Sequence, residues 1–112
     1  MKNAVIDLEK FRTKGSRVFT GRDRGIEVRN ASRIDQLETE VDFISIIIPT
    51  DIGSINPSFL EEFLFNVVNK LKADGFNKKI SFQNEGRYKI LSDLNEAIER
   101  ILREETALSP ND

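Results

Sequence analysis

Three arginines beside two glycines are the clearest candidates for binding chemistry in this sequence. Arg22 and Arg24 lie between Gly21 and Gly25, and Arg29 follows shortly after them. Arginine binds phosphate through paired hydrogen bonds, and glycine permits close approach of the backbone. The pattern therefore indicates a small-ligand, nucleotide or phosphate site. It contains neither a Gly-x-x-x-x-Gly-Lys loop nor a Gly-x-Gly-x-x-Gly fingerprint, so no established phosphate-binding motif supports this interpretation.

The same arginines belong to a basic segment, 10–33, which has two further interpretations. Such a run is most often a solvated face, and the whole chain has a formal charge of −2. The other interpretation is nucleic-acid binding, because Lys and Arg neutralise backbone phosphates. The segment has few aromatic residues, only Phe11 and Phe19, and no recognisable nucleic-acid reader module. Nucleic-acid binding is therefore the weaker alternative.

The amino-acid composition excludes several kinds of enzyme. The 112 residues include no Cys and no His. This excludes a cysteine nucleophile, a Ser-His-Asp triad and a His-ligated zinc site within the chain. The adjacent carboxylates Glu61 and Glu62 are explained by the dipole of a helix that begins nearby, and no second acid or base can be paired with them. We therefore expect a non-enzymatic domain without metal or cofactor.

Length and hydropathy predict one domain over residues 1–112. Its ordered core is expected at about residues 4–105, with a frayed tail over 106–112. The longest apolar run, 44–49, is far shorter than the roughly 20 residues of a membrane span. The first residues lack the apolar core of a signal peptide. Together with the absence of Cys, these features favour a cytoplasmic protein that makes no membrane contact.

The first part of the chain is predicted to form a β-hairpin and a weak helix. Segments 4–8 and 16–20 have the composition of strands, and a turn signal lies at 13–15 between them. The glycine-containing segment 21–25 is predicted as a loop. Apolar residues then recur every third position over 26–37, which is typical of a helix with a narrow apolar stripe.

The strongest predicted unit is a strand, a loop and a helix over residues 43–71. The near-continuous isoleucine run in 41–48 is typical of a central strand covered on both faces. Apolar residues spaced four apart then predict a helix over 58–71, with Gly75 as the residue that follows its end.

The start of this helix has two alternative caps. Asn56 can cap it with Pro57 at the first helical position, or Ser58 can form a capping box with Glu61. The second alternative gives Ser58 a structural role that needs no regulation.

The remaining elements complete the predicted fold. A short strand is expected over 79–82, a turn at 84–86, and an amphipathic helix from about residue 90 to residue 103. This order predicts an α/β fold, with a mixed β-sheet of about four strands and α-helices packed mainly on one face.

Several local motifs, together with this order of elements, suggest a family. They are Gly21-Arg22, the pattern Gly25-x-Glu27-x-Arg29, the pentapeptide Ser-Phe-Leu-Glu-Glu at 58–62 and the turn at Asn84. With these features the chain resembles the STAS-like domains, small bacterial relatives of the anti-sigma-factor antagonist fold. The resemblance covers residues 4–103.

The resemblance implies a regulatory domain that docks on a protein partner, often a histidine-kinase-like ATPase. In regulatory members this kinase phosphorylates a Ser or Thr at the start of the helix after the central strand. The matching residue here is Ser58, and Ser54 and Thr50 are further candidate phosphoacceptors. A phosphate at a helix N-terminus is favoured by the dipole, and its charge of up to about −2 would repel an acidic partner. The chain departs from the family at 48–50, where Ile-Pro-Thr replaces a strand-ending acidic residue.

The predicted partner surface consists of the loop 50–58 and the helix 58–71. On a helical wheel Phe65 falls about 145° from the centre of the apolar face, so we expect it to face outward. It is then a single solvated apolar residue, a residue that rests under the tail or a neighbouring helix, or a contact in a docking surface or a homodimer. The other expected contact residues are Asp51, Asn56, Phe59, Glu61 and Glu62.

Overall fold

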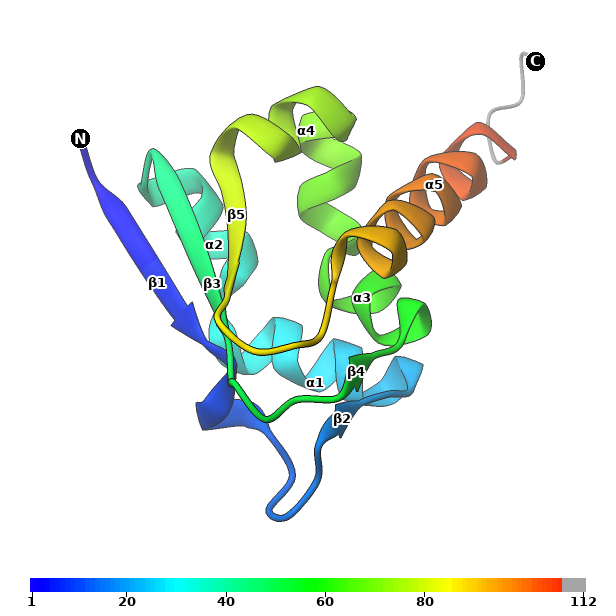
Figure 1. Cartoon of the computed structure of the whole chain (residues 1–112). Helices are drawn as coiled ribbons and strands as arrows, with labels where there is room; N and C mark the ends of the chain where they lie inside the picture. The colour runs from blue at the N-terminus through cyan, green and yellow to red at the C-terminus, as the bar shows by residue number, and fades with distance from the viewer. Residues whose placement is uncertain (108–112) are drawn as a thin grey trace.

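The computed structural model describes the backbone of residues 1–107 and the side chains of residues 1–103, and the chain forms an α/β fold (Figure 1). The elements in chain order are β1 (Asn3–Asp7), the 3-10 helix η1 (Leu8–Phe11), β2 (Val18–Phe19), α1 (Arg22–Ser32), α2 (Ile34–Glu40), β3 (Phe43–Ile48), β4 (Ser54–Ile55), α3 (Pro57–Phe63), α4 (Phe65–Lys79), β5 (Ile80–Asn84) and α5 (Leu91–Ala107). Most of the predicted tail, 108–112, lies outside the described residues.

The main sheet has three parallel strands in the order β1-β3-β5. Ala4 pairs with Ile44, and Ile44 pairs with Ile80. Side chains alternate between the two faces of a strand, and in β3 the buried positions are Ile44, Ile46 and Ile48. This alternation means that one face of the sheet carries the core.

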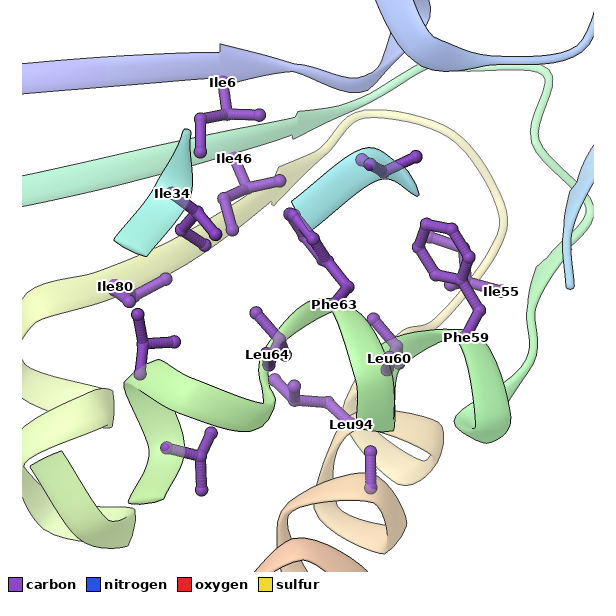
Figure 2. Close-up of a cluster of buried hydrophobic side chains, with 14 of the residues drawn as sticks. Ile6, Ile34, Ile46, Ile55, Phe59, Leu60, Phe63, Leu64, Ile80 and Leu94 are labelled. Carbon is purple, nitrogen blue, oxygen red and sulfur yellow. The ribbon is translucent and has the colours of Figure 1, made fainter. Parts of the chain in front are cut away.

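The core lies between that face of the sheet and the helices (Figure 2). Phe59, Leu60, Phe63 and Leu64 from the α3 region are all fully buried. α3 also packs against α1 and α5, so it lies at the centre of the helical layer. The expectation that helices cover mainly one face is therefore confirmed, together with the α/β class.

The opposite face of the sheet is not covered by the described helices. Phe43 is 41% exposed, and Ser45 and Ile47 on the same face are partly buried. The expectation that β3 is covered on both faces is therefore wrong. A run of isoleucines does not distinguish a strand covered on both faces from one covered on a single face. In this three-stranded sheet alternate side chains of β3 are buried and the others remain accessible.

The predicted β-hairpin is also wrong. The turn itself is present, with Ser16 N–H donating to Thr13 C=O and Gly15 at φ 81°. The strands on either side pair elsewhere: β1 lies parallel to β3, and β2 forms a separate two-stranded parallel ladder with β4. The main sheet thus has three strands rather than about four, and the described ladders are all parallel rather than mixed.

The helix boundaries differ from the prediction in three regions of the chain. In the predicted loop 21–25, Gly21 precedes α1 as its N-cap and residues 22–25 form the first turn of the helix. A Cβ on Gly25 would lie 2.5 Å from the Phe59 carbonyl oxygen of α3. Gly75 is inside α4 rather than after a helix. The predicted single helix 58–71 is divided at Leu64, and Lys72 interrupts α4 with φ 63° and ψ 178°.

No helix among residues 1–107 has both the length and the apolar character to cross a membrane.

Candidate functional site

The segment between β3 and α3 is the part of the predicted partner surface that remains accessible. Thr50, Asp51, Ser54 and Asn56 are exposed along it. Buried side chains alternate with them, namely Ile52, Ile55 and Phe59. The apolar positions fix the segment to the core, so its polar side chains are presented on a constrained backbone.

Backbone hydrogen bonds attach this segment to the chain near β2. Gly53 N–H donates to the Arg17 carbonyl oxygen at 2.7 Å, and Asn56 N–H donates to the Phe19 carbonyl oxygen at 2.8 Å. Ser54 and Ile55 form the strand β4 on this ladder. The loop between β3 and α3 is therefore fixed by long-range bonds.

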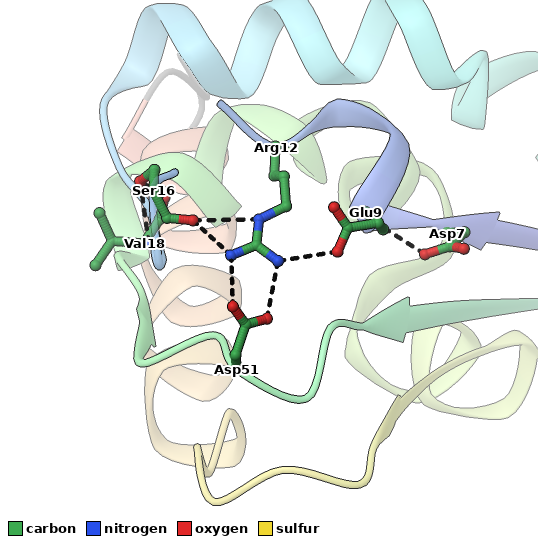
Figure 3. Close-up of polar contacts among 6 residues, drawn as sticks. All are labelled: Asp7, Glu9, Arg12, Ser16, Val18 and Asp51. Atoms are coloured by element: carbon green, nitrogen blue, oxygen red, sulfur yellow. Dashed lines mark hydrogen bonds and ion pairs between the residues drawn. The ribbon is translucent and has the colours of Figure 1, made fainter. Parts of the chain in front are cut away.

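Arg12 provides the main polar anchor of the segment (Figure 3). Its guanidinium donates to both carboxylate oxygens of Asp51, at 2.8 and 3.0 Å. It also donates to the Ser16 carbonyl oxygen and to Glu9 Oε1. These bonds lower the pKa of the Asp51 carboxyl below its ordinary value and raise the pKa of Arg12. Asp51, expected to contact a partner, is thus already paired within the chain.

The loop after β5 supports the segment from a second side. The Tyr88 hydroxyl lies within hydrogen-bond distance of the Ile55 carbonyl oxygen, at 3.0 Å, and of Asp93 Oδ2, at 2.6 Å. Burial, followed by the bond to Asp93, raises the pKa of Tyr88 above its ordinary value. A Cβ on Gly86 would lie 2.2 Å from the Thr50 carbonyl oxygen, so the two loops are in close backbone contact.

The turn at Asn84 shapes this second loop. Asn84 Oδ1 accepts from Gly86 N–H at 2.8 Å, and its amide nitrogen donates to the Tyr88 carbonyl oxygen. Asn84 therefore holds both Gly86 and Tyr88 in the positions from which they contact the segment.

The three candidate phosphoacceptors differ in exposure and setting. Thr50 and Ser54 are exposed, whereas Ser58 is partly buried. Asn56 caps α3 by accepting from Ser58 N–H at 2.8 Å, and Pro57 is the first helical residue. The cap formed by Asn56 is therefore the alternative that the structure adopts, and the capping box of Ser58 with Glu61 is wrong.

Two expected contact residues on α3 are buried, and a third, on α4, is partly buried. Phe59 is fully buried and packs against the rings of Phe19 and Phe63. Glu61 is 4% exposed. Phe65 is partly buried and packs against the core, so the expectation that it faces outward is wrong. The helical wheel fails here because α3 and α4 are separate helices, and Phe65 begins the second one.

Glu61 is a buried carboxylate between two arginines. Arg22 donates to Glu61 Oε2 at 2.9 Å and lies 3.3 Å from Glu62 Oε2. Arg100 lies 3.9 Å from Glu61 Oε1. The bond to Glu61 raises the pKa of Arg22. The structure thus joins a residue of the predicted phosphate site to two residues of the predicted partner surface, within one internal ion-pair cluster.

The structure does not bring the three arginines of the predicted phosphate site together. Arg22 pairs with Glu61 as described, Arg24 pairs with Glu27 and donates to the Phe11 carbonyl oxygen, and Arg29 donates to the Glu62 carbonyl oxygen at 2.8 Å. Each guanidinium has acceptors within the protein and lies in α1, not in a loop. These contacts do not form a phosphate cradle.

Sequence reasoning missed three residues that position the segment: Arg12, Gly86 and Tyr88. Arg12 was considered only as part of the basic segment 10–33. The only signal for Tyr88 was that it is the single tyrosine of the chain. Their partners on the segment, Asp51, Thr50 and Ile55, are distant from them in sequence, so local residue spacing cannot predict these contacts.

No cluster of three or more metal-ligating Asp or Glu residues occurs among the described residues. Comparison of the chain with known proteins found no matching protein-family model, no matching curated protein and no matching solved structure.

Proposed function

We propose that this chain is a non-enzymatic regulatory domain of STAS-like type, which binds a protein partner through the segment 50–58. The observation that supports this most is the constrained, exposed course of that segment: Asp51, Gly53, Ile55 and Asn56 are each held by a distant part of the chain. A preformed surface loses little conformational entropy when a partner binds.

The partner is a histidine-kinase-like ATPase or a comparable regulator, as the resemblance to STAS-like domains suggests. Phosphorylation of a hydroxyl on the segment switches binding, because a charge of up to about −2 changes the electrostatics of the docking face. Ser58 is the residue that matches the family pattern, and Ser54 and Thr50 are the more exposed alternatives. The burial of α3 restricts the docking surface to the segment and the first turn of the helix.

A phosphorylation assay tests the switch. The purified chain is incubated with ATP, Mg²⁺ and each histidine-kinase-like ATPase of its source organism, and modified residues are mapped by mass spectrometry. The variants Ser58→Ala, Ser54→Ala and Thr50→Ala each remove one acceptor, and Ser81→Ala on the exposed face of β5 is the matched control. We expect one of the three variants to abolish modification. Modification that persists in all three single variants and in the triple variant would exclude the switch.

A binding assay tests the docking surface separately. Ser54→Lys and Thr50→Lys add bulk and charge on the segment, whereas Ser81→Lys adds them on β5. We expect the first two to weaken binding of the same ATPase and the third to leave it unchanged. Equal binding by all three would reject the segment as the docking surface.

A further inference from the structure

The strand β1 is an edge strand with a free backbone edge. It pairs with β3 on one side, and no other described strand pairs with it (Figure 1). An edge strand presents N–H and C=O groups that can pair with a further strand.

The contacts of Lys2 establish the direction of these groups. Lys2 N–H donates to Asp42 Oδ2, and its carbonyl oxygen accepts from Asp42 N–H at 2.8 Å, so both of its backbone groups face the β3 side. Successive residues of a strand point their backbone groups to alternate sides. Asn3, Val5 and Asp7 therefore direct their N–H and C=O groups toward the free edge.

The side chains of this edge lack the features that normally prevent strand pairing. Edge strands are usually protected by charged residues, proline or a bulge. Lys2 and Asp7 stand at the two ends of the strand, but the stretch Asn3–Ile6 between them has no charge, proline or bulge, and at its centre Val5 is 62% exposed. The other edge of the sheet differs, because the exposed side chains of β5 are the polar Ser81 and Gln83. The apolar, unguarded edge is the one formed by β1.

Charge and register both favour a second copy of the same strand as the occupant. Lys2 precedes the strand and Asp7 ends it, so an antiparallel arrangement brings the basic start of one strand to the end that carries Asp7 of the other, one position from direct opposition. A parallel arrangement would bring like charges together at each end. With Val5 on a two-fold axis, Val5 of each copy pairs with the same residue of the other copy. Asn3 then lies opposite Asp7 of the other copy, an amide opposite a carboxylate.

We propose that this chain forms a homodimer through antiparallel pairing of β1 with β1 of a second copy, centred on Val5. The residues with outward backbone groups are then the hydrogen-bonded pairs of the new ladder, each exchanging two N–H···O=C bonds. In this register odd-numbered residues of one copy lie opposite odd-numbered residues of the other. The sheet faces that carry no helices therefore lie on the same side of the dimer. The result is one continuous sheet, in which the helices of both copies cover the same face.

The experiment measures the mass of the full chain in solution by analytical ultracentrifugation, up to about 1 mM, the weak end of specific association. Val5→Lys and Val5→Glu each place like charges opposite one another at the two-fold axis, while the backbone bonds of β1 to β3 are retained. We expect each variant to raise the dimer dissociation constant roughly tenfold or more, which one like-charge pair and a lost apolar contact account for. An equimolar mixture of the two variants should restore dimers, because Lys then faces Glu.

Controls separate this interface from others. Ser81→Lys introduces the same charge on β5 and should leave the dimer unchanged, and circular dichroism confirms that each variant is folded. Because the chain lacks Cys, Val5→Cys should form an intermolecular disulfide under mild oxidation, and Ser81→Cys should not. A wild-type chain that is monomeric over the whole range would overturn the proposal. So would a dimer insensitive to both Val5 variants.

Discussion

The guanidinium of Arg12 binds both carboxylate oxygens of Asp51, joining the turn before β2 to the segment after β3. The two hydrogen bonds measure 2.8 and 3.0 Å, and the arginine side chain is 12% exposed. Bidentate pairing fixes geometry as well as charge. The pair therefore sets the path of the segment 50–58 on which the proposed docking surface depends.

The first prediction concerns the acid titration of Asp51. Its pKa is lowered in the folded state by Arg12, so the ion pair stabilises the fold above the unfolded pKa of about 3.9. That contribution is lost as the pH falls through the lower, folded value. In an NMR titration of side-chain carboxyl carbons, the wild-type Asp51 should protonate below about 3.9, and Arg12→Gln should return it toward that value. Glu9→Gln, which removes a single contact of Arg12, should have a much smaller effect; identical titration of Asp51 in all three proteins would contradict the role assigned to the pair.

The second prediction concerns Gly25 and Gly86, where a side chain has no room. Alanine at position 25 gains about 1 kcal/mol of helix propensity, but its Cβ would lie 2.5 Å from a backbone oxygen of α3. At position 86 the corresponding distance to the Thr50 carbonyl oxygen is 2.2 Å. Steric overlap in packed regions costs about 1–3 kcal/mol, so both Ala variants should lower the free energy of unfolding in urea.

Gly53→Ala is the matched control for these two variants. The nearest atom to its added Cβ is the Arg17 carbonyl oxygen at 3.7 Å, an ordinary contact. The free energy of unfolding should change by less than about 0.5 kcal/mol. If Gly86→Ala were as stable as Gly53→Ala, the close contact between the two loops would not exist in solution.

The third prediction uses Tyr88, which is the only tyrosine in a chain without tryptophan, so its absorbance reports on this residue alone. Burial and the bond to Asp93 raise its pKa in the folded state. Tyr88 therefore contributes stability that is fully present below the unfolded pKa of about 10 and is lost as the pH rises above it. The phenolate absorbance should appear together with loss of the far-UV helical signal.

Substitutions at this contact separate packing from hydrogen bonding. Tyr88→Phe keeps the ring but removes the bonds to Ile55 and Asp93, and should cost about 1–2 kcal/mol of unfolding free energy. Asp93→Asn keeps an acceptor for the Tyr88 hydroxyl and should cost less unfolding free energy. In this variant Tyr88 should form its phenolate at lower pH than in the wild type, because the carboxylate that raises its pKa is gone. A phenolate that forms near pH 10 in the folded wild-type protein would disagree with the buried position of this hydroxyl.

Local sequence signals predicted most of the strands and helices, apart from β4 and the divisions between the helices, but they did not predict how the strands pair. The isoleucine run identified β3 because a dense β-branched stretch has few alternatives. The turn near Gly15 was also identified, but the partners of the flanking strands are distant in sequence, and the hairpin inferred from the turn does not form. Strand pairing depends on contacts between remote residues, which turn chemistry alone does not determine.

The errors in the helices have a common physical origin. Gly25 resembled a loop residue because glycine disfavours helices, yet in α1 its missing side chain permits close packing on α3. Phe65 resembled an outward-facing residue because the wheel assumed one continuous helix, whereas Leu64 has φ −100° and ψ 2° and divides it. In both cases tertiary packing overrides the local pattern.

The position of the segment 50–58 in the fold was predicted, but the contacts that hold it in place were not. The segment 50–58 was correctly placed between β3 and α3, since its ends follow from a strong strand and a proline-started helix. Its anchors, Arg12 and Tyr88, were not identified, because a bidentate ion pair and a hydroxyl contact depend on the fold that brings them together.

The last prediction concerns the buried carboxylate of Glu61, which is 4% exposed beside Arg22 and Arg100. Breaking a fully buried ion pair costs about 3–5 kcal/mol. The side chains of Arg22 and Arg100 are themselves 53% and 39% exposed and so remain hydrated when the carboxylate is lost. This reduces the expected cost of Glu61→Gln to roughly 2–3 kcal/mol. Glu62→Gln, at the partly exposed neighbour, should cost less than about 1 kcal/mol. Urea denaturation of both variants measures the difference. Equal stabilities would mean that Glu61 is hydrated in solution, and the packing of α1 and α5 against α3 would then be looser than this structure indicates.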